Sequence, residues 1–371
     1  MKRTQQGDRT WFLIHSWIGL KLSVLMSFVL ITGTFAVISY EIDWLLNPEM
    51  RAATPVSEVA SWGKVYESLQ TEYPRATIAS IGRQEDPWWA VEASVLTPWG
   101  ELGRLWFDPD SGAFQGATGW VNVQRFFRTT HRHLMLPTQI GIPIVASLAF
   151  PLLLSLLAGF LVYKKFWRGF FRWPRFAKPV RIWSGDLHRL LGLWSSWFLL
   201  LIALTSVWYL VEVLGGNAPP FPEAAAPMAR DSAVPQTLTG SRIDAMVADA
   251  QAALPGLSVR RIVFPQRPEG ALLIQGDLSA VLVRPRANSV AYDPSTGSRL
   301  GAYRGEALGI HQRISEMADP LHFGYFGGLG TKILWFLLGF AMSALSITGC
   351  VIYSKRLVKH HGRRGATAAP A

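Results

Sequence analysis

Four apolar stretches constrain this 371-residue chain more than any other feature of its sequence. Residues 22–40, 134–163, 190–211 and 333–354 each contain no Asp, Glu, Lys or Arg. Each stretch reaches the roughly 18 to 20 residues that a helix needs to cross a hydrocarbon core of about 30 Å. We therefore predict four transmembrane helices in a lipid bilayer. The first stretch is too long for a signal-peptide core and lacks a small-residue cleavage site, so we interpret it as a retained anchor.

Lysines and arginines cluster beside these stretches in three places: before the first, between the second and third, and after the fourth. The positive-inside rule places all three segments, and with them both chain termini, in the cytoplasm. The formal charge of +11 is then explained by membrane insertion and anionic lipid, so we predict no nucleic-acid partner. The polar regions 44–130 and 213–320 lie on the opposite side, which is the periplasm if the membrane is a Gram-negative inner membrane.

The order of span, polar domain and span occurs twice along the chain. A matching turn closes each polar domain, FDPDSGAFQGA at 107–117 and YDPSTGSRLGA at 292–302. Each domain begins with a helical pattern, at 57–73 and at 241–254, and continues with strand patterns. The strands are expected at 76–81, 88–94, 101–108, 258–264, 270–277, 279–285 and 288–293.

The predicted fold class is an α-helical membrane protein with four transmembrane helices from an internal duplication and two small extracytoplasmic α+β domains. Residues 215–235 are rich in Pro and Ala and are expected to form an irregular connector. The predicted segments are the N-terminus and first span (1–43), first domain (44–130), second span (131–164), basic loop (165–187), third span (188–212), linker and second domain (213–320), fourth span (321–354) and basic tail (355–371).

Histidines accompany all four apolar stretches. His15 precedes the first and His188 the third, and each is followed four residues later by a glycine, Gly19 and Gly192. Residues i and i+4 share one helix face, so each imidazole comes with a gap one turn away, which leaves room for a porphyrin plane. Ionisable side chains inside a membrane are energetically unfavourable and usually functional.

The second stretch is preceded by two histidines, His131 and His133, and the fourth by His322. Alternate spans run in opposite directions, so His15 and His188 start in the cytoplasmic leaflet. His322 and either His131 or His133 lie in the other leaflet, and the spacing does not choose between those two. Met135 is a further candidate axial ligand, although packing is the more common role of a methionine.

Two imidazoles on facing helices are a standard way to hold haem iron, so we predict two haems per chain, with axial ligands His15 and His188 in one leaflet and His322 with His131 or His133 in the other. Two such sites would give a two-step electron path across the membrane. Cys350 is the only cysteine, and no CxxCH segment occurs. The haem is therefore expected to be b-type, and iron–sulfur clusters are excluded.

The motifs HSWIGL, LHRLLGLW and DPLHFGYFGGLG, with the DPDSG and DPSTG turns, resemble the PepSY-associated transmembrane-helix family. Its members include inner-membrane ferric-siderophore reductases. The resemblance covers nearly the whole chain and favours His131 over His133. It implies haem b, four spans, two PepSY-like periplasmic domains and the reduction of Fe³⁺ in a chelate. Oxygen-donor chelators hold hard Fe³⁺ better than Fe²⁺. A one-electron reduction by such an oxidoreductase would therefore release the metal.

The electron donor is expected to be external, because no GxGxxG fingerprint or flavin signature occurs. Quinol or a partner reductase would serve. The alternative function is non-enzymatic: a PepSY-type binding or regulatory membrane protein whose histidines are merely interfacial. A metal permease is a weaker alternative, because the spans lack the acidic residues and broken helices usual at ion sites.

Overall fold

The computed structural model describes residues 9–17, 23–97, 99–221, 234–235 and 237–366, with side chains described as far as residue 355. The chain divides into two compact units. One, here called the helical unit, comprises residues 1–38, 126–217 and 321–371. The other, the sheet unit, comprises residues 39–125 and 218–320. The sheet unit thus draws on both predicted polar domains.

Three helical segments of the described chain are long and apolar enough to cross a membrane, namely Thr138–Val162, Ser196–Val213 and Tyr325–Lys355. The helices α2 (Ser23–Val37) and α3 (Ser39–Leu46), which are separated by a break at Ile38, meet the same criterion only as a pair. The structure therefore contains three candidate spans, or four if this broken pair counts as one.

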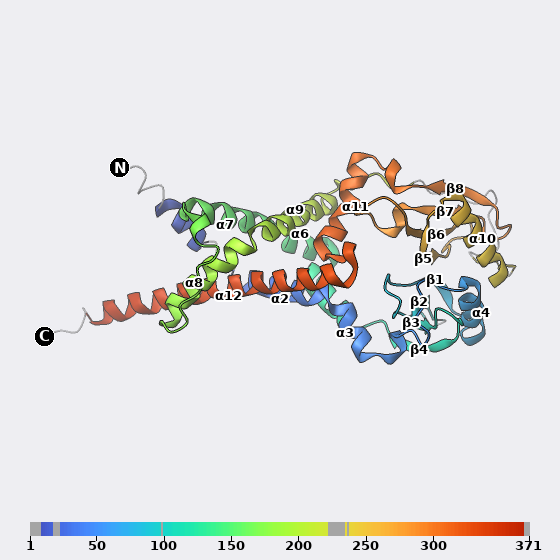
Figure 1. Cartoon of the computed structure of the whole chain (residues 1–371), viewed down its shortest axis with the longest axis horizontal. Helices are drawn as coiled ribbons and strands as arrows, with labels where there is room; N and C mark the ends of the chain where they lie inside the picture. Colours follow the sequence, from blue (N-terminus) through green and yellow to red (C-terminus); the bar gives the residue numbers. More distant parts are fainter. Residues whose placement is uncertain (1–8, 18–22, 98, 222–233, 236, 367–371) are drawn as a thin grey trace. The chain divides into compact units, whose positions relative to one another are not determined.

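The helical unit is built from α2, α5 to α9 and α12, with residues 9–17 also helical. Its further helices are α5 (Val123–His133), α6 (Thr138–Ser147), α7 (Ala149–Val162), α8 (Val180–Trp194), α9 (Ser196–Val213) and α12 (Gly328–Ala366). Helix α12 packs against α2 and α8, and α9 packs against α6 and α7. Figure 1 shows α2 and α12 lying side by side.

Small and polar side chains hold α2 against α12. The hydroxyls of Ser27 and Ser346 lie 2.8 Å apart, and those of Thr34 and Ser343 lie 3.2 Å apart. A Cβ at Gly339 would be 2.8 Å from the Thr34 hydroxyl, so the glycine permits this close approach. Small residues and interhelical hydroxyl contacts are the usual means of helix association in lipid, where apolar contact alone gives no preference for a neighbouring helix.

The sheet unit contains one eight-stranded antiparallel sheet in the order β4-β3-β2-β1-β5-β6-β7-β8. The first copy supplies β1 (Thr77–Gly82), β2 (Val91–Leu96), β3 (Leu102–Phe107) and β4 (Phe114–Gly119); the second supplies β5 (Ser258–Val263), β6 (Leu272–Asp277), β7 (Ser289–Tyr292) and β8 (Arg299–Tyr303). The two copies join where β1 pairs with β5. The two α+β motifs predicted from the sequence therefore share a sheet, because their first strands pair and cover each other's edge.

Two helices of this unit, α4 (Trp62–Glu72) and α10 (Gly240–Ala253), pack against each other and cover one face of the sheet. Ser61 caps α4 and also donates to Asp244 on α10 at 2.6 Å. The N–H of Gly63 donates to the same carboxylate at 2.9 Å. Both helices lie close to their predicted ranges, and their apolar side chains form the core with the inward residues of β1, β2, β5 and β6.

The two DPxxG-type turns have the conformation that their sequences predict. Gly112 and Gly297 each have φ of 76°, a left-handed conformation that glycine adopts without strain. Asp108 at the start of the first turn accepts hydrogen bonds from Ser111 and from the N–H of Thr54. Burial alone would raise the pKa of Asp108, but these hydrogen bonds outweigh it and lower that pKa below its ordinary value.

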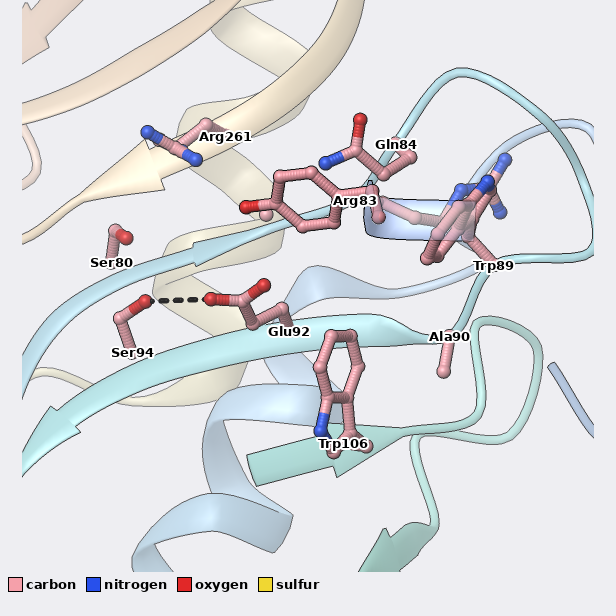
Figure 2. A pocket seen from close by; sticks show the side chains of 11 residues that line it. Ser80, Arg83, Gln84, Trp89, Ala90, Glu92, Ser94, Trp106 and Arg261 are labelled. Carbon is pink, nitrogen blue, oxygen red and sulfur yellow. Dashed lines mark hydrogen bonds between the residues drawn. The ribbon is translucent and has the colours of Figure 1, made fainter. Parts of the chain in front are cut away.

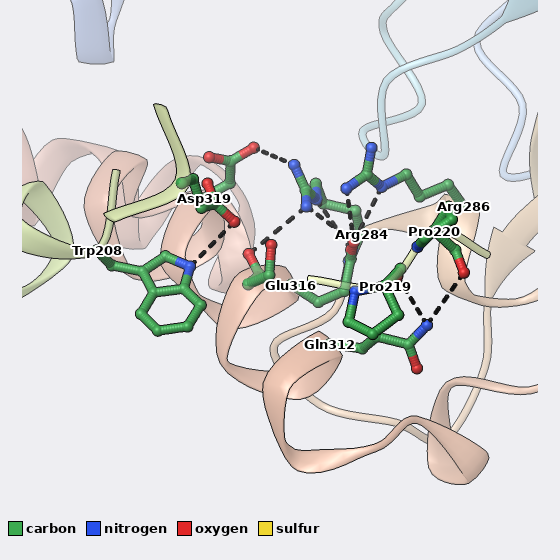
Figure 3. Close-up of polar contacts among 10 residues, drawn as sticks. Trp208, Pro219, Pro220, Arg284, Arg286, Gln312, Glu316 and Asp319 are labelled. Atoms are coloured by element: carbon green, nitrogen blue, oxygen red, sulfur yellow. Dashed lines mark hydrogen bonds and ion pairs between the residues drawn. The ribbon is translucent and has the colours of Figure 1, made fainter. Parts of the chain in front are cut away.

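One strand prediction is wrong. Residues 279–285 form a turn that leads into the 3-10 helix Pro285–Ala287, and β6 pairs directly with β7. Leu282 has a φ of 58°, which breaks an extended chain. Arg284 is held away from the sheet by Glu316 at 2.8 Å and Asp319 at 2.7 Å on α11 (Ile310–Phe323), as Figure 3 shows. Strands β4 and β8 were not predicted.

Candidate functional site

Two pairs of histidine rings lie inside the helical unit. The ring centres of His15 and His188 are 6.1 Å apart, and those of His131 and His322 are also 6.1 Å apart. A metal ion bound at about 2 Å by one nitrogen of each of two opposed imidazoles separates their ring centres by roughly 6 Å. Both pairs therefore have the spacing of two axial ligands, and they are the pairs that the sequence predicts.

The first pair is held by the carbonyl groups of two apolar helices. Nδ1 of His15 lies 3.0 Å from the carbonyl oxygen of Ser155 on α7, and Nδ1 of His188 lies 2.9 Å from that of Leu345 on α12. A carbonyl oxygen can only accept, so Nδ1 carries the hydrogen in both rings. The Nε2 lone pair is then available to a metal ion, and the second-shell hydrogen bond fixes the ring orientation.

The second pair is held in the same way. Nδ1 of His131 lies 2.9 Å from the carbonyl oxygen of Val29 on α2, and Nδ1 of His322 lies 2.8 Å from the hydroxyl oxygen of Thr205 on α9. The Thr205 hydroxyl is within donating distance of carbonyl groups of its own helix, so it is placed to accept from His322. All four imidazoles thus share one tautomer, in which the Nε2 lone pair is the one that can bind a metal ion.

Two glycines border these rings. A Cβ at Gly33 on α2 would lie 2.5 Å from Cε1 of His131, and a Cβ at Gly349 on α12 would lie 3.3 Å from Cε1 of His188. Sequence reasoning missed both residues. A repeated motif could have identified them, because each glycine ends an Ile-Thr-Gly tripeptide, at 31–33 and at 347–349.

The glycines that the sequence did single out lie elsewhere. A Cβ at Gly192 on α8 would meet the Leu345 side chain at 3.4 Å, so this glycine lies at the contact between α8 and α12. Its predicted role in making room for a porphyrin stays a prediction. Gly19 lies outside the described residues.

An apolar cavity adjoins the His131 and His322 pair. Its empty volume, open solvent included, is about 460 Å³. Apart from the two histidines, its walls are apolar side chains, glycines and Thr34, including Leu30, Phe198, Ile202, Trp335 and Met342. A flat apolar group that needs two axial nitrogens fits the chemistry of this lining, since apolar surroundings exclude water from the metal.

The two pairs lie at different depths of the same bundle. Gly339 lines the cavity beside His131 and His322, whereas Gly349 borders His188. Ten residues along α12 correspond to about 15 Å at 1.5 Å per residue. Within the described residues, no group of three or more His, Cys, Asp or Glu side chains is placed to hold a metal ion.

His131, and not His133, is the residue that faces another histidine. Nδ1 of His133 lies 2.6 Å from the carbonyl oxygen of Leu136, in the turn that ends α5. Leu134 and Met135 in that turn both have positive φ, which reverses the chain after His131. The sulfur of Met135 accepts a hydrogen bond from Thr129 at 3.2 Å, and the side chain is exposed.

A helix bundle with apolar candidate spans and two half-buried histidine pairs, in one chain with an eight-stranded antiparallel sheet, defines a membrane protein with metal-ligand geometry in its helices. The chain belongs to the PepSY-associated transmembrane family, whose model (PepSY-associated TM region) matches residues 12–356. No curated protein matches the chain.

Proposed function

We propose that this protein is a membrane-bound reductase with two haems b that delivers electrons to Fe³⁺ in a chelate. The observation that supports it most strongly is the geometry of the two histidine pairs, each 6.1 Å between ring centres with every Nδ1 held by an oxygen. Haem bound at each pair would supply one-electron chemistry. The resemblance to a family with ferric-siderophore reductases supports the substrate class.

The chain's own residues have defined roles in this proposal. His15 and His188 would ligate one haem, and His131 and His322 the other. The carbonyl oxygens of Ser155, Leu345 and Val29 and the hydroxyl of Thr205 would fix the tautomer and orientation of these ligands. The apolar side chains around each pair would exclude water and keep the imidazoles neutral.

The direction of electron flow follows from the basic segments. If these are cytoplasmic, as the positive-inside rule predicts, electrons enter near His15 and His188 from quinol or a partner reductase and leave near His131 and His322. The sheet unit would lie in the periplasm and receive the ferric chelate. In a Gram-negative cell the protein would lie in the inner membrane, with both termini in the cytoplasm.

The first test is spectroscopic. Purified protein should show dithionite-sensitive Soret and α bands, and a pyridine haemochrome assay should give two haems per chain. Single alanine variants of His15 and His188 should lose the same haem, those of His131 and His322 should lose the other, and His133→Ala should retain both. A colourless protein would favour the non-enzymatic PepSY-type alternative.

The second test concerns the substrate. Dithionite-reduced protein mixed anaerobically with a ferric chelate should reoxidise while ferrozine traps Fe²⁺. His322→Ala should keep the haem at His15 and His188 and transfer electrons much more slowly. If the reduced wild-type protein is reoxidised by none of a hydroxamate, a catecholate and a mixed-ligand chelate, the reductase assignment is wrong.

A further inference from the structure

The face of the sheet opposite α4 and α10 carries a polar pocket. Residues that pair across neighbouring strands point to the same face, and one such row runs Arg261 on β5, Gly82 on β1, Glu92 on β2 and Trp106 on β3. The next residues of these strands, such as Ile81, point to the opposite face and lie in the core. The pocket therefore crosses the seam where the two copies of the motif join.

The walls of this pocket combine aromatic rings with hydrogen-bond donors. The row forms its floor, and Tyr40, Arg83, Gln84 and Trp89 complete the wall, with an empty volume of about 370 Å³. Figure 2 shows Arg261 approaching from β5 on one side, and Trp106 and Trp89 on the other.

Arg83 is the buried cation of this pocket. Its side chain is 8% exposed, and Nη2 donates to the carbonyl oxygen of Ser57 at 2.6 Å. Nη1 is fully buried and has no hydrogen-bond partner in the described part of the chain. A guanidinium nitrogen buried without an acceptor is energetically unfavourable, and such groups are rare in folded proteins. An acceptor supplied by a ligand would satisfy it.

The groups around Arg83 also leave its positive charge without enough negative charge nearby. Burial, followed by the charge of Arg260, lowers the pKa of Arg83 more than nearby Glu58 raises it. Arg260 is paired with Asp277 at 2.6 Å, whereas the guanidinium of Arg261 has no hydrogen bond or ion pair to any described residue. The pocket is thus short of negative charge.

Glu92 does not supply the missing negative charge, because its carboxylate already interacts with Ser94 and Arg104. It accepts from Ser94 at 3.0 Å and lies 3.4 Å from Nε of Arg104. Arg104 is itself 4% exposed, and its Nη1 is a second buried nitrogen without an acceptor in the described chain.

Gly82 positions the second cation. A Cβ at Gly82 would lie 3.2 Å from Nε of Arg261, so the glycine lets this guanidinium lie over the pocket floor. Arg261 is exposed and can meet a ligand from the open side, and Arg83 lines the same pocket from a buried position. Guanidinium groups bind planar oxygen anions through paired N–H donors and stack on aromatic faces.

We propose that this pocket binds an anionic, aromatic arm of the ferric chelate, such as a catecholate or an aryl carboxylate, between Arg83 and Arg261. The proposal rests on the proposed function for the identity of the substrate. Three hydroxamates neutralise Fe³⁺, whereas three catecholates leave a strongly negative complex. The pocket therefore selects anionic over neutral ferric chelates.

Calorimetric titration of the full-length protein tests this proposal without any electron donor. The probes are the ferric complex of 2,3-dihydroxybenzoate, the neutral ferric trihydroxamate ferrichrome, and iron-free 2,3-dihydroxybenzoate. The anionic ferric complex should bind most tightly. Arg261→Gln should weaken its binding about tenfold, because one charge-assisted contact is lost.

Arg267→Gln is the matched control, since Arg267 is an exposed arginine of the same unit that does not line the pocket. It should bind the anionic complex like the wild type. Arg83→Lys keeps the buried charge but loses the forked donors, and should also weaken binding.

Three outcomes would overturn the proposal: equal effects of Arg261→Gln and Arg267→Gln, equal affinity for the trihydroxamate complex, or equal affinity for the iron-free acid. Each can be observed whether or not the protein reduces iron. A failure of the reductase assay with intact, Arg261-dependent binding would contradict the proposed function and leave the pocket assignment standing.

Discussion

Gly33 offers the sharpest test of the histidine geometry, because the space that its missing side chain leaves is filled by the His131 ring. A Cβ at this position would lie 2.5 Å from Cε1 and 2.7 Å from Nδ1 of His131. An ordinary carbon contact is about 3.5 Å or longer, so in Gly33→Ala the ring must move by about 1 Å. The ring is the far end of a side chain, and it moves more readily than the helix backbone.

A shift of about 1 Å is large for a metal ligand, since ligand distances are normally kept within about 0.2 Å. Gly33→Ala should therefore lose the haem at His131 and His322, and the pyridine haemochrome ratio should fall from two towards one. The fold should survive, because alanine in a helix interior is favoured over glycine by roughly 1 kcal/mol. Thermal unfolding followed by circular dichroism checks this second expectation.

Gly159→Ala is the matched control, since it is the same change within α7 and nothing lies within 4 Å of the added Cβ. This variant should keep both haems. Retention of two haems with an unchanged spectrum in Gly33→Ala would refute the reasoning, because His131 would then not be confined by α2 in its ligating position.

Two further predictions concern the sheet unit. Glu316 is buried, and although burial alone would raise its pKa, its ion pairs with Arg284 and Arg286 lower that pKa below its ordinary value. This stabilisation is present at neutral pH and should be lost as the pH falls below about 4.3, so thermal unfolding should show a smaller loss of stability in acid for Glu316→Gln than for the wild type. Asp244→Ala should lower the stability of the unit by about 2 kcal/mol, because the hydroxyl of Ser61 and the N–H of Gly63 lose their acceptor, which denaturant titration measures.

Periodicity in the sequence predicted the elements that depend on local signals. The helices α4 and α10 follow from apolar stripes behind Ser61 and Thr239, which cap them. The turns at Gly112 and Gly297 follow from residues that adopt positive φ. The strand predicted at 279–285 was wrong because its apolar pattern is local, whereas the ion pairs that hold Arg284 come from α11, about thirty residues later.

The joining of the two motifs could not be predicted in the same way. The pairing of β1 with β5 links Ser80 to Val263, about 180 residues further along the chain. The sequence of a single strand indicates that it pairs with neighbouring strands, but not which strands these are. The duplication predicted two similar motifs, and only the structure shows that their first strands are neighbours.

The histidine pairing was within reach of the sequence because the duplication supplies a symmetry argument. Equivalent residues on equivalent spans start in the same leaflet, so His15 and His188 could be paired without any coordinates. The choice between His131 and His133 could not be made by spacing, because it depends on the turn at Leu134 and Met135, where two consecutive non-glycine residues have positive φ. No propensity predicts such a turn.

The contact between α2 and α12 links helix packing to the geometry of both histidine pairs. Gly33 on α2 borders His131, and Gly349 on α12 borders His188, so each helix of this contact leaves space for one ring. Val29 on α2 and Leu345 on α12 accept the Nδ1 hydrogens of the same two histidines. One turn of each helix thus both accepts the hydrogen and makes room for the ring. Because the Ile-Thr-Gly tripeptide occurs in both helices, the same local arrangement holds a histidine at two depths of the bundle.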